Sequence, residues 1–329
     1  MRKSLTPVAL LILALIATLP LGIRYYAYLP LYGHRGPLPD ATWEERALEA
    51  RLREHVVAIA STPHNTDHPA ALEAAAVYIE RQLEQLGYPI ERQEYVAGGQ
   101  KVRNIHTALG EPGPGKPAFV VGAHYDSAGI APGANDNGSG TAALIELSRL
   151  LKGFNPKLQY IRIVFFVNEE DPHFGTELMG SYQFARMLAK REPVSGMISI
   201  ETIGAYYDKP GTQRFPVPLN LVYRDTGDFL TFVGMPTGRE LVHKAIGSFR
   251  RHTAFPSIGG IAHRVIPGIA WSDHASFDAL GIPAIMITDT APFRYPHYHK
   301  ATDTPDKIDF PRLARVTKGL ERMLREIVE

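Results

Sequence analysis

Histidines and carboxylates occur in a few short segments of this sequence, and their types fit metal chemistry. His124-Tyr125-Asp126 follows the apolar run Ala-Phe-Val-Val-Gly-Ala. In an extended segment, residues two apart point the same way, so Asp126 is placed to accept the second ring N–H of His124. Such a contact fixes the tautomer while the other ring nitrogen binds a metal. Taken alone, the pair is equally compatible with a structural role.

A glycine-rich loop supplies another carboxylate. Residues 133–140 read Gly-Ala-Asn-Asp-Asn-Gly-Ser-Gly, with Asp136 at the centre, and a predicted helix follows. Glycine allows backbone segments to approach closely, so this carboxylate is able to face a ligand. The alternative is a helix N-cap in which Asp136 or Asn137 accepts hydrogen bonds from free helix N–H groups. Taken alone, the segment favours the cap.

Two adjacent carboxylates, Glu169 and Glu170, end the most strongly apolar run of the chain, residues 160–168. Unpaired charges at the end of a buried strand are costly. A metal resolves this cost if one glutamate is a ligand and its neighbour is a general base that takes a proton from water. The alternative is a solvated loop start.

Glu201 and His299 complete the candidate set. Glu201 ends a short apolar run at 197–200, and His299 lies in a turn-rich loop with Asp303 as its expected orienting partner. Two histidines and several carboxylates form a nitrogen and oxygen ligand set that suits zinc. Most of these residues follow predicted strands, so the sequence predicts a metal site at one edge of a sheet.

The elements that must position these residues alternate along the chain. We predict strands at 117–124, 160–168, 197–200 and 283–288 from their apolar runs, and helices near 72–87, 144–151, 177–190 and 313–327 from their periodicity. This alternation indicates an α/β fold with a mostly parallel sheet and helices on both faces. Ligands in such sheets bind at the carboxyl ends of the strands.

The N-terminus predicts a membrane location. An uncharged stretch at 5–23 lies between basic residues, and as a helix it is about as long as a bilayer core is thick. We therefore expect residues 1–24 to form a transmembrane anchor, or alternatively a signal peptide, with 25–40 as a linker. We expect 41–329 to be one catalytic domain, with an irregular insertion at 205–265. The basic N-terminal side predicts that this domain is exported to the periplasm or the cell exterior, anchored or secreted.

Composition excludes several classes of function. The chain has no cysteine, which removes thiolate zinc sites and cysteine nucleophiles, and its formal net charge of +1 offers no field for nucleic acid. Gly110 to Lys116 imitates a phosphate-binding loop, but Pro117 stands in place of its Ser or Thr. Neither H-E-x-x-H nor G-x-S-x-G occurs.

Five segments together resemble the M28 zinc aminopeptidase and carboxypeptidase family. They are 124–126, 133–140, 168–170, Ser-Asp-His-Ala-Ser-Phe at 272–277, and His299-x-x-x-Asp303-Thr304. The resemblance covers about residues 50–310. It implies a three-layer α/β/α fold with a mixed central sheet, two co-catalytic zinc ions and a peptide substrate.

The resemblance also implies a role for each site residue. Asp136 would bridge the two metals, His124 and Glu170 would hold one of them, and Glu201 and His299 would hold the other. Glu169 would be the general base, and Asp126 would orient His124. The chain departs from the family pattern at Glu201, where Asp is usual.

A second departure concerns the residue that polarises the substrate carbonyl. Some members place a tyrosine shortly before the Ser-Asp-His segment, where this chain has Ile269, Ala270 and Trp271. Tyr295 or Tyr298 is the expected substitute. Two alternatives remain open: a glutaminyl-cyclase-like enzyme with a single zinc, and a non-catalytic ectodomain of the same fold. The oligomeric state is left open.

Overall fold

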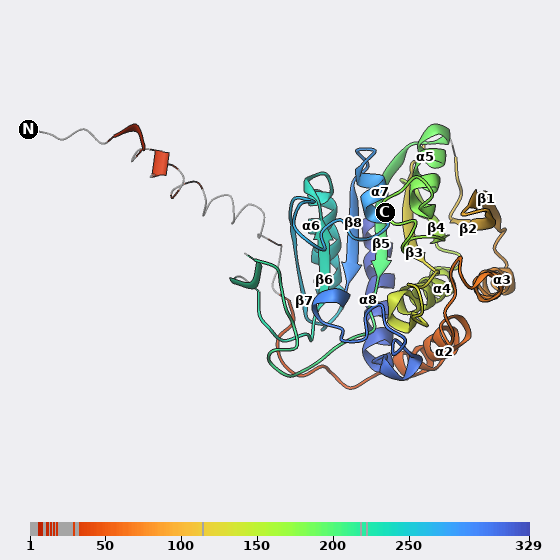
Figure 1. The fold of residues 1–329 in the computed structure, drawn as a ribbon, viewed down its shortest axis with the longest axis horizontal. Helices are drawn as coiled ribbons and strands as arrows, with labels where there is room; N and C mark the ends of the chain where they lie inside the picture. Colours follow the sequence, from red (N-terminus) through yellow and green to blue (C-terminus); the bar gives the residue numbers. More distant parts are fainter. Residues whose placement is uncertain are drawn as a thin grey trace, which may run out of the picture.

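A computed structural model describes residues 6–8, 11–12, 14, 16, 18, 29, 33–113, 115–217, 219–221 and 223–329. Its centre is an eight-stranded sheet in the order β1-β2-β4-β3-β5-β8-β6-β7 (Figure 1). The strands are β1 (Glu91–Ala97), β2 (Gln100–Leu109), β3 (Ala118–His124), β4 (Tyr160–Phe166), β5 (Val194–Glu201), β6 (Leu230–Gly234), β7 (Ser257–Ile261) and β8 (Ala284–Thr288).

The sheet is mixed, as the resemblance implies. β4, β3, β5 and β8 run parallel to one another, and β6 is parallel to β7. The β1–β2, β2–β4 and β6–β8 pairs are antiparallel. The central strands are continuous apolar runs because both of their faces are covered. Gly122 lies within β3, and a Cβ atom there would lie 2.3 Å from the Phe166 ring, so a larger residue would displace that buried ring.

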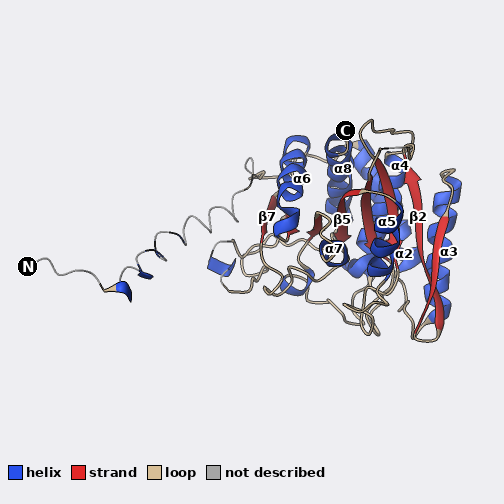
Figure 2. Cartoon of the chain, turned by 90° about the horizontal axis from the view of Figure 1, so that it is seen from above, coloured by secondary structure: helices blue, strands red, loops and turns tan. Residues whose placement is uncertain are grey.

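Helices cover both faces of the sheet, which confirms the three-layer α/β/α prediction (Figure 2). One apolar core packs α2, α3, α4, α6 and α8 against the strands, and a second core packs α5 and α7 against the other face. The helices are α2 (Trp43–Ile59), α3 (Pro69–Gln85), α4 (Gly140–Leu150), α5 (Gly180–Arg191), α6 (Arg239–His252), α7 (His274–Asp278) and α8 (Phe310–Ile327).

The hairpin of β1 and β2 was not predicted from the sequence. β1 is an edge strand, and most of its residues are exposed or half-buried, so it carries little hydrophobic alternation. Its anchor is electrostatic instead. The carboxylate of Glu80 on α3 accepts hydrogen bonds from Arg92 of β1 at 2.8 Å and from Arg103 of β2 at 2.7 Å.

The prediction of an irregular insertion at 205–265 is wrong for its second half. β6, α6 and β7 form a regular strand–helix–strand unit of the main sheet. α6 carries Leu241, Val242, Ala245, Ile246 and Phe249 on its buried side, and this helical periodicity was readable in the sequence. The short glycine-rich β7 hid the unit, because Gly259 replaces an apolar residue where a Cβ atom would lie 2.2 Å from the Phe232 carbonyl oxygen.

The first half, 205–229, is a loop whose described residues contain one 3₁₀ turn, Leu219–Leu221. Arg294 holds both ends of this loop. Its Nη1 donates to the carbonyl oxygens of Ala205 at 3.1 Å and Phe229 at 2.8 Å, and its Nε donates to Gln213 Oε1 at 2.7 Å. Arg294 is 6% exposed, so these contacts are made away from water.

Arg294→Ala is expected to lower the free energy of unfolding by about 3 kcal/mol, because it leaves buried carbonyl groups without a donor. Urea unfolding followed by circular dichroism measures this loss. Arg224→Ala is the matched control, since Arg224 makes an ion pair with Asp228 at the surface of the same loop, with 46% of its side chain exposed. The control should lose less than about 1 kcal/mol. Equal losses would contradict the assignment of Arg294 as the buried anchor.

The predicted anchor at 1–24 falls largely outside the described residues. Within the described part of the chain, no helix combines the length and apolar character needed to cross a membrane. The predicted export of the catalytic domain stays a prediction.

Candidate metal centre

The predicted site residues come together at the carboxyl edge of the parallel strands. His124 is the last residue of β3, Glu201 is the last residue of β5, and Glu169 and Glu170 follow β4. Because β4, β3, β5 and β8 are parallel neighbours, their carboxyl ends meet at one edge. Loops that follow the Gly133 turn and β8 bring Asp136 and His299 to the same place.

The Asp136 carboxylate lies between the two imidazoles. Its Oδ1 is 3.4 Å from His124 Nε2, and its Oδ2 is 3.1 Å from His299 Nε2. Asp136 is 4% exposed and His124 is fully buried. One carboxylate therefore faces both histidines with separate oxygens, in the shared position that the resemblance implies.

Each imidazole has a second carboxylate beside it. Glu201 Oε2 is 3.3 Å from His124 Nε2, and Glu170 Oε2 is 3.2 Å from His299 Nε2. These contacts exchange the two glutamates relative to the pairing that the resemblance implies. Ligand atoms of Glu170, Asp136 and His124 also lie within 4.8 Å of one another, so the centre is compact. The shorter contacts favour Glu201 with His124 and Glu170 with His299.

Asp126 accepts hydrogen bonds from residues at the ends of two neighbouring strands, β3 and β4. Its backbone oxygen accepts a hydrogen bond from His124 Nδ1 at 3.1 Å, and its carboxylate Oδ1 lies 3.5 Å from the same nitrogen. The carboxylate accepts the backbone N–H groups of Glu169 at 3.1 Å and Glu170 at 3.2 Å. Asp126 thus fixes the His124 tautomer mainly through its carbonyl group, which leaves Nε2 to accept a ligand. Its side chain positions the two glutamates.

Asp303 does not orient His299 as predicted. Its carboxylate accepts the backbone N–H groups of Asn135 at 2.9 Å and Asp136 at 3.2 Å. The loop that carries His299 thereby fixes the loop that carries Asp136. Two segments far apart in the sequence are positioned together by one buried carboxylate.

Two positioning residues were not predicted from the sequence. Ser272 donates its hydroxyl to Glu201 Oε2 at 2.8 Å. Asp289, directly after β8, accepts from the Asn135 side-chain amide at 2.9 Å and from the backbone N–H of Ala205 at 2.8 Å. The position of Asp289 at a strand end was the available signal.

The electrostatics of the cluster favour bound positive charge. Burial raises the pKa of Glu169 well above its usual range. The nearby His124 lowers this pKa, and the neighbouring glutamates raise it further. Burial and Asp136 raise the pKa of Glu170 to about 8, while its contact with His299 acts in the opposite direction. Burial would also raise the pKa of Asp136, but hydrogen bonds from both histidines outweigh it and hold that pKa below its usual range. The carboxylates outnumber the imidazoles, so the cluster attracts cations.

The residues fit a divalent metal. His124 Nε2 and Glu170 Oε1 are buried, and within the described part of the chain neither has a hydrogen-bond partner. Such orphaned atoms are costly unless something binds them. The ligand atoms are imidazole nitrogens and carboxylate oxygens, which zinc accepts.

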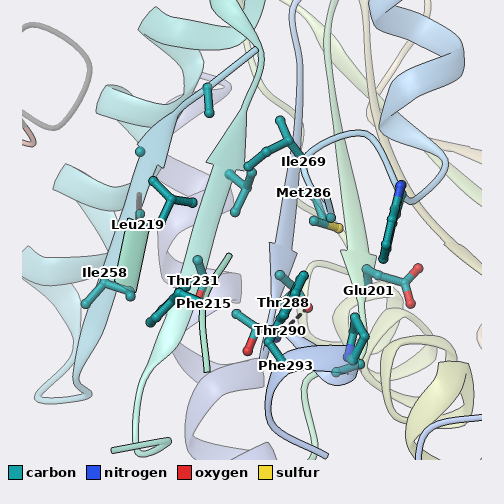
Figure 3. A pocket seen from close by; sticks show the side chains of 18 of the residues that line it. Glu201, Phe215, Leu219, Thr231, Ile258, Ile269, Met286, Thr288, Thr290 and Phe293 are labelled. Atoms are coloured by element: carbon teal, nitrogen blue, oxygen red, sulfur yellow. Dashed lines mark hydrogen bonds between the residues drawn. The ribbon is translucent and has the colours of Figure 1, made fainter. Parts of the chain in front are cut away.

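An apolar cavity opens beside the cluster. Its volume is about 790 Å³ when the part open to solvent is included, and both Glu201 and Tyr298 line it. Figure 3 shows Glu201 at one side and Thr288, Thr231 and Ile258 following in order towards the other. The cavity therefore runs from the carboxylate cluster across β8 and β6 to β7.

The family model described as "Peptidase family M28" matches residues 104–323, which is two thirds of the chain and includes every candidate site residue. The chain belongs to peptidase family M28. Its similarity to the Escherichia coli K12 protein named "Uncharacterized protein YfbL" is 35% identity over 271 residues, covering 80% of this chain and 82% of that protein.

Solved structures with the same fold include both peptidases and a cyclase. BSAP, a zinc aminopeptidase from Bacillus subtilis, superposes with a TM-score of 0.69 at 15% identity, covering 88% of this chain and 97% of that chain. The Fimbriiglobus ruber glutaminyl cyclase superposes with a TM-score of 0.62 at 18% identity, covering 88% of this chain and 99% of that chain. These likenesses show the fold that the M28 chain shares with them.

The two tyrosines considered for this M28 peptidase have different surroundings. Tyr295 donates its hydroxyl to Asp303 Oδ1 at 2.7 Å, so that hydroxyl is already engaged. Tyr298 stacks on His299, with ring centroids 3.8 Å apart and an interplanar angle of 21°. Burial raises the pKa of Tyr298, and the nearby carboxylates of Asp136 and Glu170 add to the effect. Tyr298 is therefore the tyrosine that faces the cluster.

Proposed function

We propose that this M28 peptidase is an aminopeptidase that uses two zinc ions and a glutamate general base. The observation that carries the proposal is the Asp136 carboxylate, which faces His124 with one oxygen and His299 with the other. His124 and Glu201 would hold one ion, Glu170 and His299 the other, and Asp136 both. When bound, such ions supply Lewis-acid polarisation of a carbonyl group and make water more acidic.

Glu169 carries the proton in this proposal. Its backbone N–H is bound by Asp126, and its Oε2 lies 3.9 Å from His124 Nε2, so its carboxylate faces the cluster without being the nearest partner of either imidazole. A buried carboxylate of raised pKa is suited to take a proton from water and then give it to the leaving amine. Tyr298 is placed to donate a hydrogen bond to the scissile carbonyl oxygen.

Cleavage at the N-terminus is supported by the surroundings of Glu201. Glu201 borders both the cluster and the cavity, so its carboxylate is placed to accept a hydrogen bond from the terminal amino group of a substrate. The cavity beside Glu201 offers a place for one side chain next to the cluster. Together these features fit recognition of the first residue of a peptide.

Removal of metal is expected to abolish peptidase activity, since nothing then polarises the scissile carbonyl group or makes water more acidic. The test is hydrolysis of a panel of aminoacyl anilides by the purified full-length protein before and after treatment with 1,10-phenanthroline. Addition of Zn²⁺ should restore the activity. Undiminished activity in chelator, with the metal shown to be gone, would refute the metal-dependent mechanism.

A second candidate function is glutaminyl cyclisation with one zinc, which the shared fold of the Fimbriiglobus ruber enzyme keeps open. Metal analysis separates the two functions. Two zinc ions per chain with anilide hydrolysis support the aminopeptidase. One tightly bound zinc with cyclisation of N-terminal glutamine supports the cyclase.

A further inference from the structure

The cavity contains a buried hydroxyl group without a partner. Thr231 of β6 lines the cavity and is 4% exposed, and its Oγ1 has no hydrogen-bond partner in the part of the chain that the structure describes. Its neighbour across the sheet is Thr288, whose hydroxyl is 2.9 Å from Thr202 Oγ1 and accepts the Thr290 N–H at 2.8 Å. Because an unpaired buried hydroxyl is costly, Thr231 has a hydrogen bond to offer a ligand.

The rest of the lining is suited to a large apolar group. Phe215, Leu219 and Tyr223 of the 205–229 loop form one wall, and Ile258 of β7 lies at the far end. The Tyr223 hydroxyl donates to the Gly259 carbonyl oxygen at 2.8 Å, so it is already engaged. Glu201 at the cluster end is the one charged residue of the lining. A charged side chain deep in this cavity would lack a counter-ion, which is costly.

The distance between the metal cluster and Thr231 favours a long substrate side chain. Glu201 is on β5 and Thr231 is on β6, two strand intervals away in the order β5-β8-β6. Adjacent strands lie about 4.8 Å apart, so Thr231 is about 10 Å from the strand that carries Glu201. Figure 3 shows Thr288 between them. A short aliphatic side chain ends over β8, whereas an aromatic side chain with a polar tip extends towards Thr231.

We infer that this cavity binds the side chain of the N-terminal residue of the substrate and selects tyrosine. Thr231 Oγ1 would form a hydrogen bond with the phenolic hydroxyl. The inference rests on the proposed aminopeptidase function and adds its side-chain preference. The apolar walls enclose the ring, and Thr231 offers the phenol a buried hydroxyl that has no partner among the residues that the structure describes.

The test compares tyrosyl, phenylalanyl, leucyl and lysyl anilides through kcat/KM. The wild-type protein should prefer tyrosyl over phenylalanyl substrate by about tenfold, the size of one neutral hydrogen bond. Thr231→Val keeps the shape and removes the hydroxyl, so this ratio should fall to about one. Thr231→Ser returns the hydroxyl and should recover the preference. Titration calorimetry with free L-tyrosine and L-phenylalanine should show the same ratios in Kd.

Thr317→Val is the matched control. Thr317 is a buried threonine of α8 whose hydroxyl donates to the Leu313 carbonyl oxygen at 2.8 Å, and it does not line the cavity. Its variant should keep the wild-type ratio of tyrosyl to phenylalanyl turnover. This separates loss of a hydroxyl in the cavity from a general loss of stability.

Two outcomes overturn the inference, and the first of them needs no variant. One is a wild-type protein that cleaves phenylalanyl or leucyl substrate at least as well as tyrosyl. The other is a Thr231→Val protein that keeps the wild-type preference. If the protein cleaves leucyl substrate better than tyrosyl substrate and a chelator stops this cleavage, the tyrosine preference is wrong but the proposed aminopeptidase function stands. Absence of cleavage of every anilide by the zinc-loaded protein refutes the proposed function itself.

Discussion

Glu169→Gln is expected to lower kcat by about 10²–10⁴-fold while the protein keeps its fold and its metal. The amide has the size of the carboxylate but cannot take a proton from water. Glu169 is not the nearest partner of either imidazole, so metal ligation should survive the change. Steady-state kinetics with the preferred anilide, together with metal content by mass spectrometry, measures both parts of this prediction.

Glu177→Gln is the control for this experiment. Glu177 follows the same strand end as Glu169, and 74% of its side chain is exposed at the surface. Its variant should retain wild-type kcat, because no cluster residue contacts it in the described structure. If Glu169→Gln keeps more than a tenth of the wild-type kcat, another group is the base. If it loses its metal, Glu169 is a ligand.

Part of the candidate site was readable from the sequence, because several of its residues directly follow recognisable strands. Apolar runs mark buried strands, and a polar residue directly after such a run lies at the carboxyl edge of the sheet. His124, Glu170 and Glu201 were found in this way. Asp136 and His299 lie in loops, where strand position gives less information, and the resemblance to M28 peptidases supplied their roles.

The pairing within the cluster was not readable from the sequence. Which glutamate lies beside which histidine depends on distances across the sheet and between loops, and spacing along the chain does not report these. Glu170 follows β4 next to β3, yet its carboxylate lies 3.2 Å from His299, which comes from a loop far along the chain. Asp126 likewise holds the 169–170 turn through backbone N–H groups, which carry no sequence signal.

The elements that build the apolar cavity were the least predictable. β6 and β7 have five residues each, and glycine replaces apolar residues in β7 where strands approach closely. The 205–229 loop is held by the buried Arg294, whose partners are mostly backbone carbonyl groups. Substrate preference depends on these segments, which is why the sequence predicted the chemistry of the site before its specificity.

Asp136→Asn is expected to remove both metals, not one. The Asp136 carboxylate faces His124 and His299 with different oxygens, so its charge is shared by both halves of the cluster. Replacement of residues that merely orient metal ligands already weakens affinity by about 10–100-fold, and loss of a shared anionic ligand should exceed this. Zinc per chain should fall from two to near zero by mass spectrometry, with anilide hydrolysis lost.

Asp306→Asn provides the comparison, because Asp306 lies in the loop after Asp303 with 66% of its side chain exposed and is paired with Lys307. It should keep two zinc ions and wild-type hydrolysis. An Asp136→Asn protein that retains one zinc and loses hydrolysis would place Asp136 on a single ion, contrary to the shared position. If it retains both ions, the four remaining histidine and glutamate ligands suffice, and Asp136 acts on the protons of the cluster instead. The contacts of Asp136 to both imidazoles favour the loss of both ions, because neither half of the cluster keeps its full anionic charge without that carboxylate.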